Sequence, residues 1–155
     1  MERETSIGSE ELIGRILALI EDEEDPVARM ANIVAELHDQ RDYFWTGWYR
    51  VGEGELILGP FQGPTACTRI RKGQGVCGTA WDRNETVVVP DVEEFPGHIA
   101  CDPRSRSEIV LPVRDGQGEV AAVLDIDSDR KHAFGAEEQD FLETLVRRVE
   151  PMALP

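Results

Sequence analysis

The sequence has no apolar run long enough to cross a lipid bilayer. Its first residues, Met1–Glu4, also lack the apolar stretch of a secretory signal peptide. We therefore expect a cytoplasmic protein without a membrane partner. Because cytoplasmic thiols are kept reduced, we do not expect a closed set of structural disulfides.

Cationic side chains are also few. The 155 residues include 16 Lys or Arg and 31 Asp or Glu, which gives a formal net charge of −15. A surface of this sign repels phosphate backbones, so we expect no nucleic acid partner. It favours a cationic group on a small ligand, although solubility alone also explains an acidic surface.

Cysteine is scarce, and the three that occur, Cys67, Cys77 and Cys101, are an odd number. Cysteines in a reducing compartment are core residues, metal ligands or redox groups. Taken singly, Cys67 and Cys77 fit buried packing positions. Cys101 lies in an irregular segment before Asp102 and Pro103, and is a candidate reactive thiol.

Two motifs for a cofactor or a metal are weak. The run Gly73–Gly78 matches G-x-G-x-x-G, but the helix after it is short and no second nucleotide-binding half follows. The three cysteines and His98 fit no zinc-knuckle spacing. We therefore expect no cofactor and no metal, and we expect His98 to hydrogen-bond the backbone.

The order of apolar patterns predicts one α+β domain over residues 1–155. Ser9 is the expected N-cap of the first helix, and Pro26 suits the first turn of the second. The breaker-rich stretch Gly59–Pro64 is predicted as a loop, and Asp91–Ser105 as a long ordered loop of the kind that often carries function. The predicted helices cover 9–21, 26–39, 76–83 and 136–152, and the predicted strands cover 44–51, 55–58, 66–70, 86–89, 108–113 and 120–127.

The order of these elements predicts a central, mainly antiparallel sheet with helices packed on one face. The N-terminal helices cover about 9–39, the sheet core with its loops about 43–128, and the closing helix about 136–152. Asp125 and Asp127 are two apart on a strand and therefore point to the same face. Their apolar neighbours indicate a partly buried pair, which is costly without a partner. An exposed sheet face is the alternative.

Several segments, in this order and at this spacing, resemble the free methionine-(R)-sulfoxide reductase family. The resemblance spans about residues 43 to 140. Trp48 is one departure, because the family commonly has Phe there. The segments that carry it are Trp45–Tyr49, Leu58–Cys67, Gly73–Gly78, Pro90–Asp102, Ser105–Val110 and Val123–Ser128.

The resemblance implies a GAF fold, a homodimer, thioredoxin as reductant, and repair of free methionine sulfoxide under oxidative stress. It implies that Cys101 attacks the sulfoxide sulfur and becomes a sulfenic acid. Cys67 then condenses with it to a disulfide, which thioredoxin reduces. Cys77 is either a spare resolving thiol or the nucleophile itself.

The carboxylates carried over from the family are Glu108, Asp125 and Asp127. Three acids in one cavity raise one another's pKa, so one of them is expected to stay protonated. We expect Glu108 to donate that proton to the sulfoxide oxygen.

Trp45 and Tyr49 share one side of a strand and are predicted to enclose the methyl-sulfur end of the substrate. Ordinary core aromatics are the alternative. The loop Asp91–Ser105 is predicted to cover the substrate, with a backbone N–H or Arg106 at its carboxylate. Two other functions stay open: a GAF module that binds a ligand without chemistry, and a thiol redox sensor.

Overall fold

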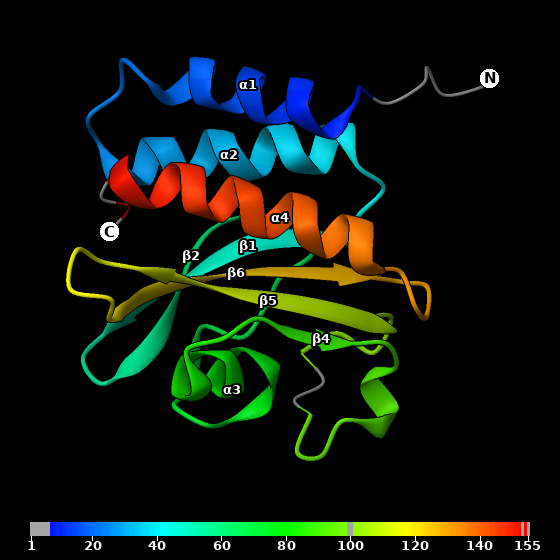
Figure 1. Cartoon of the computed structure of the whole chain (residues 1–155). Coiled ribbons are helices and arrows are strands. Elements are labelled where there is room, and N and C mark those ends of the chain that lie inside the picture. Colours follow the sequence, from blue (N-terminus) through cyan, green and yellow to red (C-terminus); the bar gives the residue numbers. More distant parts are fainter. Residues whose placement is uncertain (1–6, 99–100, 153, 155) are drawn as a thin grey trace.

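A six-stranded antiparallel sheet runs through the middle of the molecule (Figure 1). The computed structural model describes residues 7–98, 101–152 and 154. The strand order is β3-β2-β1-β6-β5-β4, so the central pair β1 and β6 joins two hairpins that are distant in sequence. The strands are β1 (Trp45–Gly52), β2 (Glu55–Gln62), β3 (Arg69–Arg71), β4 (Val87–Val89), β5 (Ser107–Arg114) and β6 (Val120–Ser128).

Three long helices cover one face of this sheet, as predicted, and confirm the α+β class (Figure 1). They are α1 (Ser9–Ile20), α2 (Pro26–Gln40) and α4 (Ala136–Val149), and a 3-10 turn, η2 (Glu150–Met152), follows α4. The short helix α3 (Gly75–Arg83) and the turn η1 (Val92–Glu94) lie on the opposite face. Among the described residues, no helix has both the length and the apolar character that a bilayer crossing requires.

The first two helices begin at residues with different capping chemistry. The Asp25 side chain accepts a hydrogen bond from the Ala28 N–H at 3.0 Å, and Pro26 occupies the first turn of α2, as predicted. The predicted cap at Ser9 is wrong, because Gly8 is the N-cap of α1 and no side chain caps this end. The exposed acids Glu10 and Glu11 in the first turn are favourably placed for the helix dipole instead.

The two central strands bury side chains on both faces. Ile109, Leu111 and Leu124 pack beneath the long helices, whereas Val110 and Val123 join the cluster on the α3 side. This alternation follows from the two-residue period of a strand. Because both faces are covered, β5 and β6 read as nearly continuous apolar runs, and the polar exceptions Glu108, Asp125 and Asp127 stand out.

The strand β2 is longer than the sequence predicts. The predicted loop at 59–64 is wrong, because β2 continues through Gly59 and Pro60 to Gln62. The strand β3 pairs only with Glu55–Ile57, so β2 becomes a sheet edge beyond that point. An edge tolerates proline, whose missing N–H costs no ladder hydrogen bond there.

Candidate functional site

A pocket opens on the sheet face that carries α3. Its walls come from β1, β5, β6, the first turn of α3, and the loops around residues 65, 98 and 101–105. The space between these walls, including the open mouth, is about 560 Å³. Seven predicted site residues line it: Trp45, Tyr49, Cys77, Cys101, Glu108, Asp125 and Asp127.

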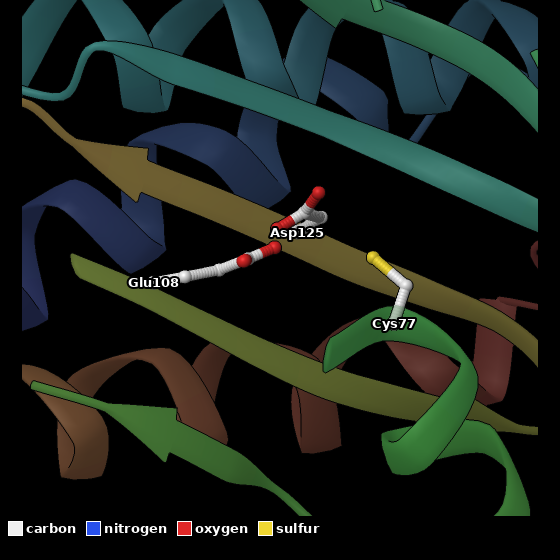
Figure 2. Close-up of side chains that lie close together, drawn as sticks. All are labelled: Cys77, Glu108 and Asp125. Carbon is white, nitrogen blue, oxygen red and sulfur yellow. The ribbon is translucent and has the colours of Figure 1, made fainter. Parts of the chain in front are cut away.

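The three carboxyl groups meet because of strand register. Glu108 on β5 lies opposite Asp127 on β6, and Asp125 is two residues further along the same face. All three are almost fully buried, with 6%, 9% and 6% of their surfaces exposed. Figure 2 shows Glu108 and Asp125 pointing toward each other from the two strands.

Burial, followed by the charge of Asp127, raises the pKa of Glu108 to about 8. Burial and the neighbouring carboxylates also raise the pKa values of Asp125 and Asp127 well above the ordinary value. Burial therefore favours the protonated form of these carboxyl groups. One oxygen of Asp125, Oδ1, is buried and lacks a hydrogen-bond partner within the described part of the chain.

Cys77 projects from the first turn of α3 toward these acids (Figure 2). Its Sγ and one oxygen each of Glu108 and Asp125 lie within 4.8 Å of one another. Burial raises the pKa of the Cys77 thiol, and the charges of Asp125, Glu108 and Asp127 raise it further. A thiol in this environment stays protonated and is a poor nucleophile.

Cys67 and Cys101 form a disulfide at the edge of the pocket. Their Cα atoms are 5.7 Å apart, although 34 residues separate them in the sequence. Cys101 is exposed and lines the pocket, whereas Cys67 is partly exposed and directly follows Ala66, which also lines the pocket. This is the pair that the family resemblance implies.

The aromatic wall is a stack of three rings. The ring centroids of Trp45 and Tyr49 are 6.0 Å apart, and those of Trp45 and Phe61 are 5.3 Å apart. Gly47 lies between Trp45 and Tyr49 on β1. A Cβ atom there would come within 2.4 Å of the Trp45 ring and 2.5 Å of Phe61 Cβ, so only glycine leaves room for the stack.

The polar ends of these rings hold a neighbouring loop. Trp45 Nε1 donates a hydrogen bond to the Pro64 carbonyl at 3.0 Å, and the Tyr49 hydroxyl donates one to the Cys67 carbonyl at 2.8 Å. Both residues also line the pocket. Trp48, the departure from the family pattern, is fully buried on the opposite face, where its Nε1 donates to the Met30 carbonyl.

His98 is the site residue that sequence reasoning missed. Its backbone N–H bonds the Phe95 carbonyl, but its ring lines the pocket, with Nε2 3.7 Å from Glu108 Oε1. Burial lowers the pKa of His98, which favours the neutral imidazole, although Asp125 opposes this shift. Its place within the long loop, three residues before Cys101, was the available signal.

The prediction for Arg106 is wrong. Its guanidinium is half exposed, lies 3.8 Å from Glu93 and does not line the pocket. The alternative, backbone N–H groups, fits better, because Gly75 and Val76 at the start of α3 line the pocket. The first turn of a helix has free N–H groups and a positive dipole end that favour an anion.

Of the three cysteines and His98, whose spacing fits no zinc knuckle, Cys67 and Cys101 are bonded to each other. Within the described residues, the group close enough to hold an ion is Cys77, Glu108 and Asp125. A thiol and two carboxylates suit a zinc-like ion better than Mg²⁺ or Ca²⁺. The same atoms face the pocket, so an ion there would compete with any ligand.

Comparisons with known proteins agree with this geometry. The family model of the GAF domain matches residues 8–150. The chain is 49% identical to GAF domain-containing protein A of Dictyostelium discoideum over 142 residues, which cover 91% of this chain and 89% of that protein. It is 45% identical to free methionine-R-sulfoxide reductase of Escherichia coli over 134 residues, which cover 86% of this chain and 81% of that protein.

A solved structure, that of free methionine-R-sulfoxide reductase from Neisseria meningitidis in complex with its substrate, is also similar. Its TM-score is 0.91 at 42% identity, covering 98% of this chain and 92% of that one. The chain therefore belongs to the GAF domain family. Within that family it belongs with the free methionine-R-sulfoxide reductases, as its motifs indicated.

Proposed function

We propose that this protein reduces free methionine (R)-sulfoxide to methionine with electrons from Cys101 and Cys67. The observation that carries the proposal is a bonded cysteine pair at the edge of a pocket that also holds three buried carboxyl groups. The reductases at 45% and 42% identity support this choice of substrate.

The pocket offers a partner for each part of a free amino acid. The unpartnered Asp125 Oδ1 suits the substrate ammonium, and the α3 N–H groups suit its carboxylate. The aromatic side chains of Trp45 and Tyr49, which line the pocket, suit the methyl-sulfur end. A residue within a peptide chain lacks both charged groups, so the site favours the free amino acid.

In the first step, the Cys101 thiolate attacks the sulfoxide sulfur while Glu108 protonates the sulfoxide oxygen. Methionine sulfur gains two electrons and Cys101 loses two, becoming a sulfenic acid as methionine leaves. A Glu108 pKa of about 8 supports this role, because the carboxyl keeps a transferable proton at neutral pH.

In the second step, the Cys67 thiol attacks the Cys101 sulfenic acid, and a disulfide and one water form. Thioredoxin then reduces the disulfide through a mixed intermediate. The sum is two thiols and one sulfoxide giving one disulfide, methionine and water. The buried, protonated Cys77 supports Cys101 rather than Cys77 as the nucleophile.

Single-turnover chemistry tests the assignment. Reduced protein is mixed with excess free methionine (R)-sulfoxide without a reductant, and released methionine is counted. We expect one equivalent from the wild type, from Cys67→Ser and from Cys77→Ser, and none from Cys101→Ser. One equivalent from Cys101→Ser would overturn the assignment.

A thiol redox sensor is the second candidate, because the exposed Cys101 forms a disulfide with Cys67. It predicts disulfide formation with peroxide but no methionine from the sulfoxide. An assay with thioredoxin and its NADPH-dependent reductase separates the two, since only the enzyme consumes NADPH in proportion to sulfoxide. We also propose a cytoplasmic homodimer, which light scattering at assay concentration tests.

A further inference from the structure

Tyr49 joins two parts of the site that act at different times. Its ring stacks beside Trp45 in the pocket wall, and its hydroxyl donates a 2.8 Å hydrogen bond to the backbone carbonyl of Cys67. The ring therefore faces the substrate space, while the hydroxyl holds the backbone of the thiol that acts after methionine has left. The two ends of one side chain can be separated experimentally.

The backbone around Cys67 is fixed at three points. Besides the Tyr49 contact, the Pro64 carbonyl accepts a hydrogen bond from Trp45 Nε1 at 3.0 Å, and the Thr68 carbonyl accepts one from the Leu58 N–H at 3.0 Å. Two of these donors are side chains of β1, and the third is the backbone of β2. A short segment held to the rigid sheet in this way has little freedom to move.

The partner thiol has a different setting. Cys101 is exposed, and the polar contacts just after it join near neighbours: Arg104 pairs with Asp102 at 2.8 Å, and the Ser105 N–H bonds the Asp102 carbonyl. Arg104 also lies over the Phe44 ring at 5.0 Å, with its guanidinium largely exposed to solvent. The pair thus combines a thiol anchored to the sheet with a thiol on a surface segment.

We infer that the Tyr49 hydroxyl is a positioning group for the resolving step, holding Cys67 where the Cys101 sulfenic acid can be attacked. This role rests on the proposed function. In that step a Cys67–Cys101 bond forms and the S–O bond of the sulfenic acid breaks. The departing hydroxyl group takes up the proton of the Cys67 thiol and leaves as water.

The effect is one of proximity. Holding a nucleophile near its target raises its effective concentration, and a small displacement lowers the rate steeply. Burial and the nearby acids raise the pKa of the Tyr49 phenol, so it keeps its proton and remains a donor throughout the cycle. Losing a hydrogen bond to a partly buried carbonyl should lower the population of the correctly held Cys67 segment by roughly tenfold.

The test separates the two steps in Tyr49→Phe, which keeps the ring and removes only the hydroxyl. Reduced protein is mixed with one equivalent of free methionine (R)-sulfoxide, and methionine and disulfide are followed in quenched samples. Methionine release in the same samples measures any effect of the substitution on the first step. We expect disulfide formation about tenfold slower, with a sulfenic acid that a 1,3-dione traps.

Tyr43→Phe is the matched control. Tyr43 is a half-buried tyrosine on the helix side of the sheet, and its hydroxyl donates to Glu138. Removing this hydroxyl makes the same chemical change away from the pocket, so both steps should keep wild-type rates. Thermal unfolding of both variants in the oxidised state shows whether each is folded.

Two results would overturn the inference. Disulfide formation at the wild-type rate in Tyr49→Phe would show that the hydroxyl positions nothing. An equal slowing of both steps would show that Tyr49 acts on substrate alone. Hydrogen peroxide also converts Cys101 to a sulfenic acid, so disulfide formation can be measured without methionine sulfoxide. If the proposed substrate is wrong, the Tyr49→Phe effect on disulfide formation should still appear with peroxide. If the Tyr49 hydroxyl positions nothing, the effect should be absent with both oxidants.

Discussion

At the scale of single residues, the most informative feature is a carboxyl group that keeps its proton. Burial and Asp127 raise the pKa of Glu108 to about 8. Single-turnover methionine release should therefore fall as pH rises through about 8, because the donor must be protonated. Stopped-flow or rapid-quench profiles in wild type and Glu108→Gln check this. The variant should be slower by about 100-fold and should lack this alkaline limb; an unchanged limb would exclude Glu108 as donor.

The same raised pKa makes Glu108 a liability for stability. Between the ordinary glutamate value of 4.5 and about 8, the folded state holds a proton that the unfolded state has lost. The free energy of unfolding therefore decreases with pH across this window and levels off above it. Since each pKa unit corresponds to about 1.4 kcal/mol, and relaxation reduces the effect, we expect Glu108→Gln to be more stable by about 2 kcal/mol at pH 8.

Urea unfolding at pH 5 and pH 8 measures that difference. The gain in Glu108→Gln should be small at pH 5 and larger at pH 8, and Glu137→Gln, an exposed acid in the first turn of α4, should show no such growth. A constant difference at both values of pH would mean that the carboxyl ionises in the folded state as it does in the unfolded one.

The residues of the site were predictable to different degrees. Asp125 and Asp127 follow from strand periodicity, because an acid pair two apart in an apolar run must share a face. His98 does not, because its side chain reaches Glu108 from a loop that has no period to extrapolate. Arg106 shows the converse: a plausible charge for a carboxylate lies in solvent beside Glu93.

At the scale of elements, α3 depends on a glycine that the helix pattern does not explain. A Cβ at Gly78 would lie 2.4 Å from the Arg71 carbonyl oxygen, which is backbone and cannot give way. Gly78→Ala should push α3 away from the turn before it and displace Cys77. We expect a loss of about 1–3 kcal/mol in the free energy of unfolding, together with a weakened site.

Gly14 in α1 is the matched comparison for Gly78. It is exposed, and a Cβ there would meet nothing within 4 Å. Gly14→Ala should stabilise the protein by about 0.5–1 kcal/mol through helix propensity, with unchanged activity. Equal effects of the two substitutions in chemical denaturation would show that the close approach at Gly78 is relieved without cost.

Element boundaries were less predictable than element order. Glycine and proline at 59–60 indicate a loop locally, but pairing with β1 carries β2 through them to Gln62. Likewise, Gly8 rather than Ser9 caps α1. In both cases tertiary contacts override the local propensity of the sequence. Cross-strand pairing and helix packing involve residues that lie outside the local sequence window.

At the scale of the whole molecule, one covalent bond links two segments that 34 residues separate. Closing a loop of this length restricts the unfolded chain and is worth about 3–4 kcal/mol in the chain-entropy model. The oxidised protein should therefore unfold at a higher denaturant concentration than the reduced protein. Cys67→Ser, which cannot form the bond, should unfold identically with and without reductant. Equal stability of both wild-type forms would contradict the expectation.

The net charge of −15 acts on a ligand in solution around the molecule, whereas the buried acids act only on a ligand inside the pocket. The surface charge is screened by salt, whereas groups inside the pocket are screened much less. The overall composition suggested attraction for a cation, but it could not say where. Only the register of β5 and β6 gathers three carboxyl groups in one place.

The Cys67–Cys101 bond also has a metabolic meaning. While it is closed, the attacking sulfur is occupied, so in the proposed cycle each molecule stops after a single event and waits for electrons from outside. Throughput then tracks the cell's supply of reducing power rather than the amount of damaged amino acid. When oxidants have depleted the cell's reductant, the disulfide would stay closed and turnover would stop. The remaining reductant would then be available to other reactions.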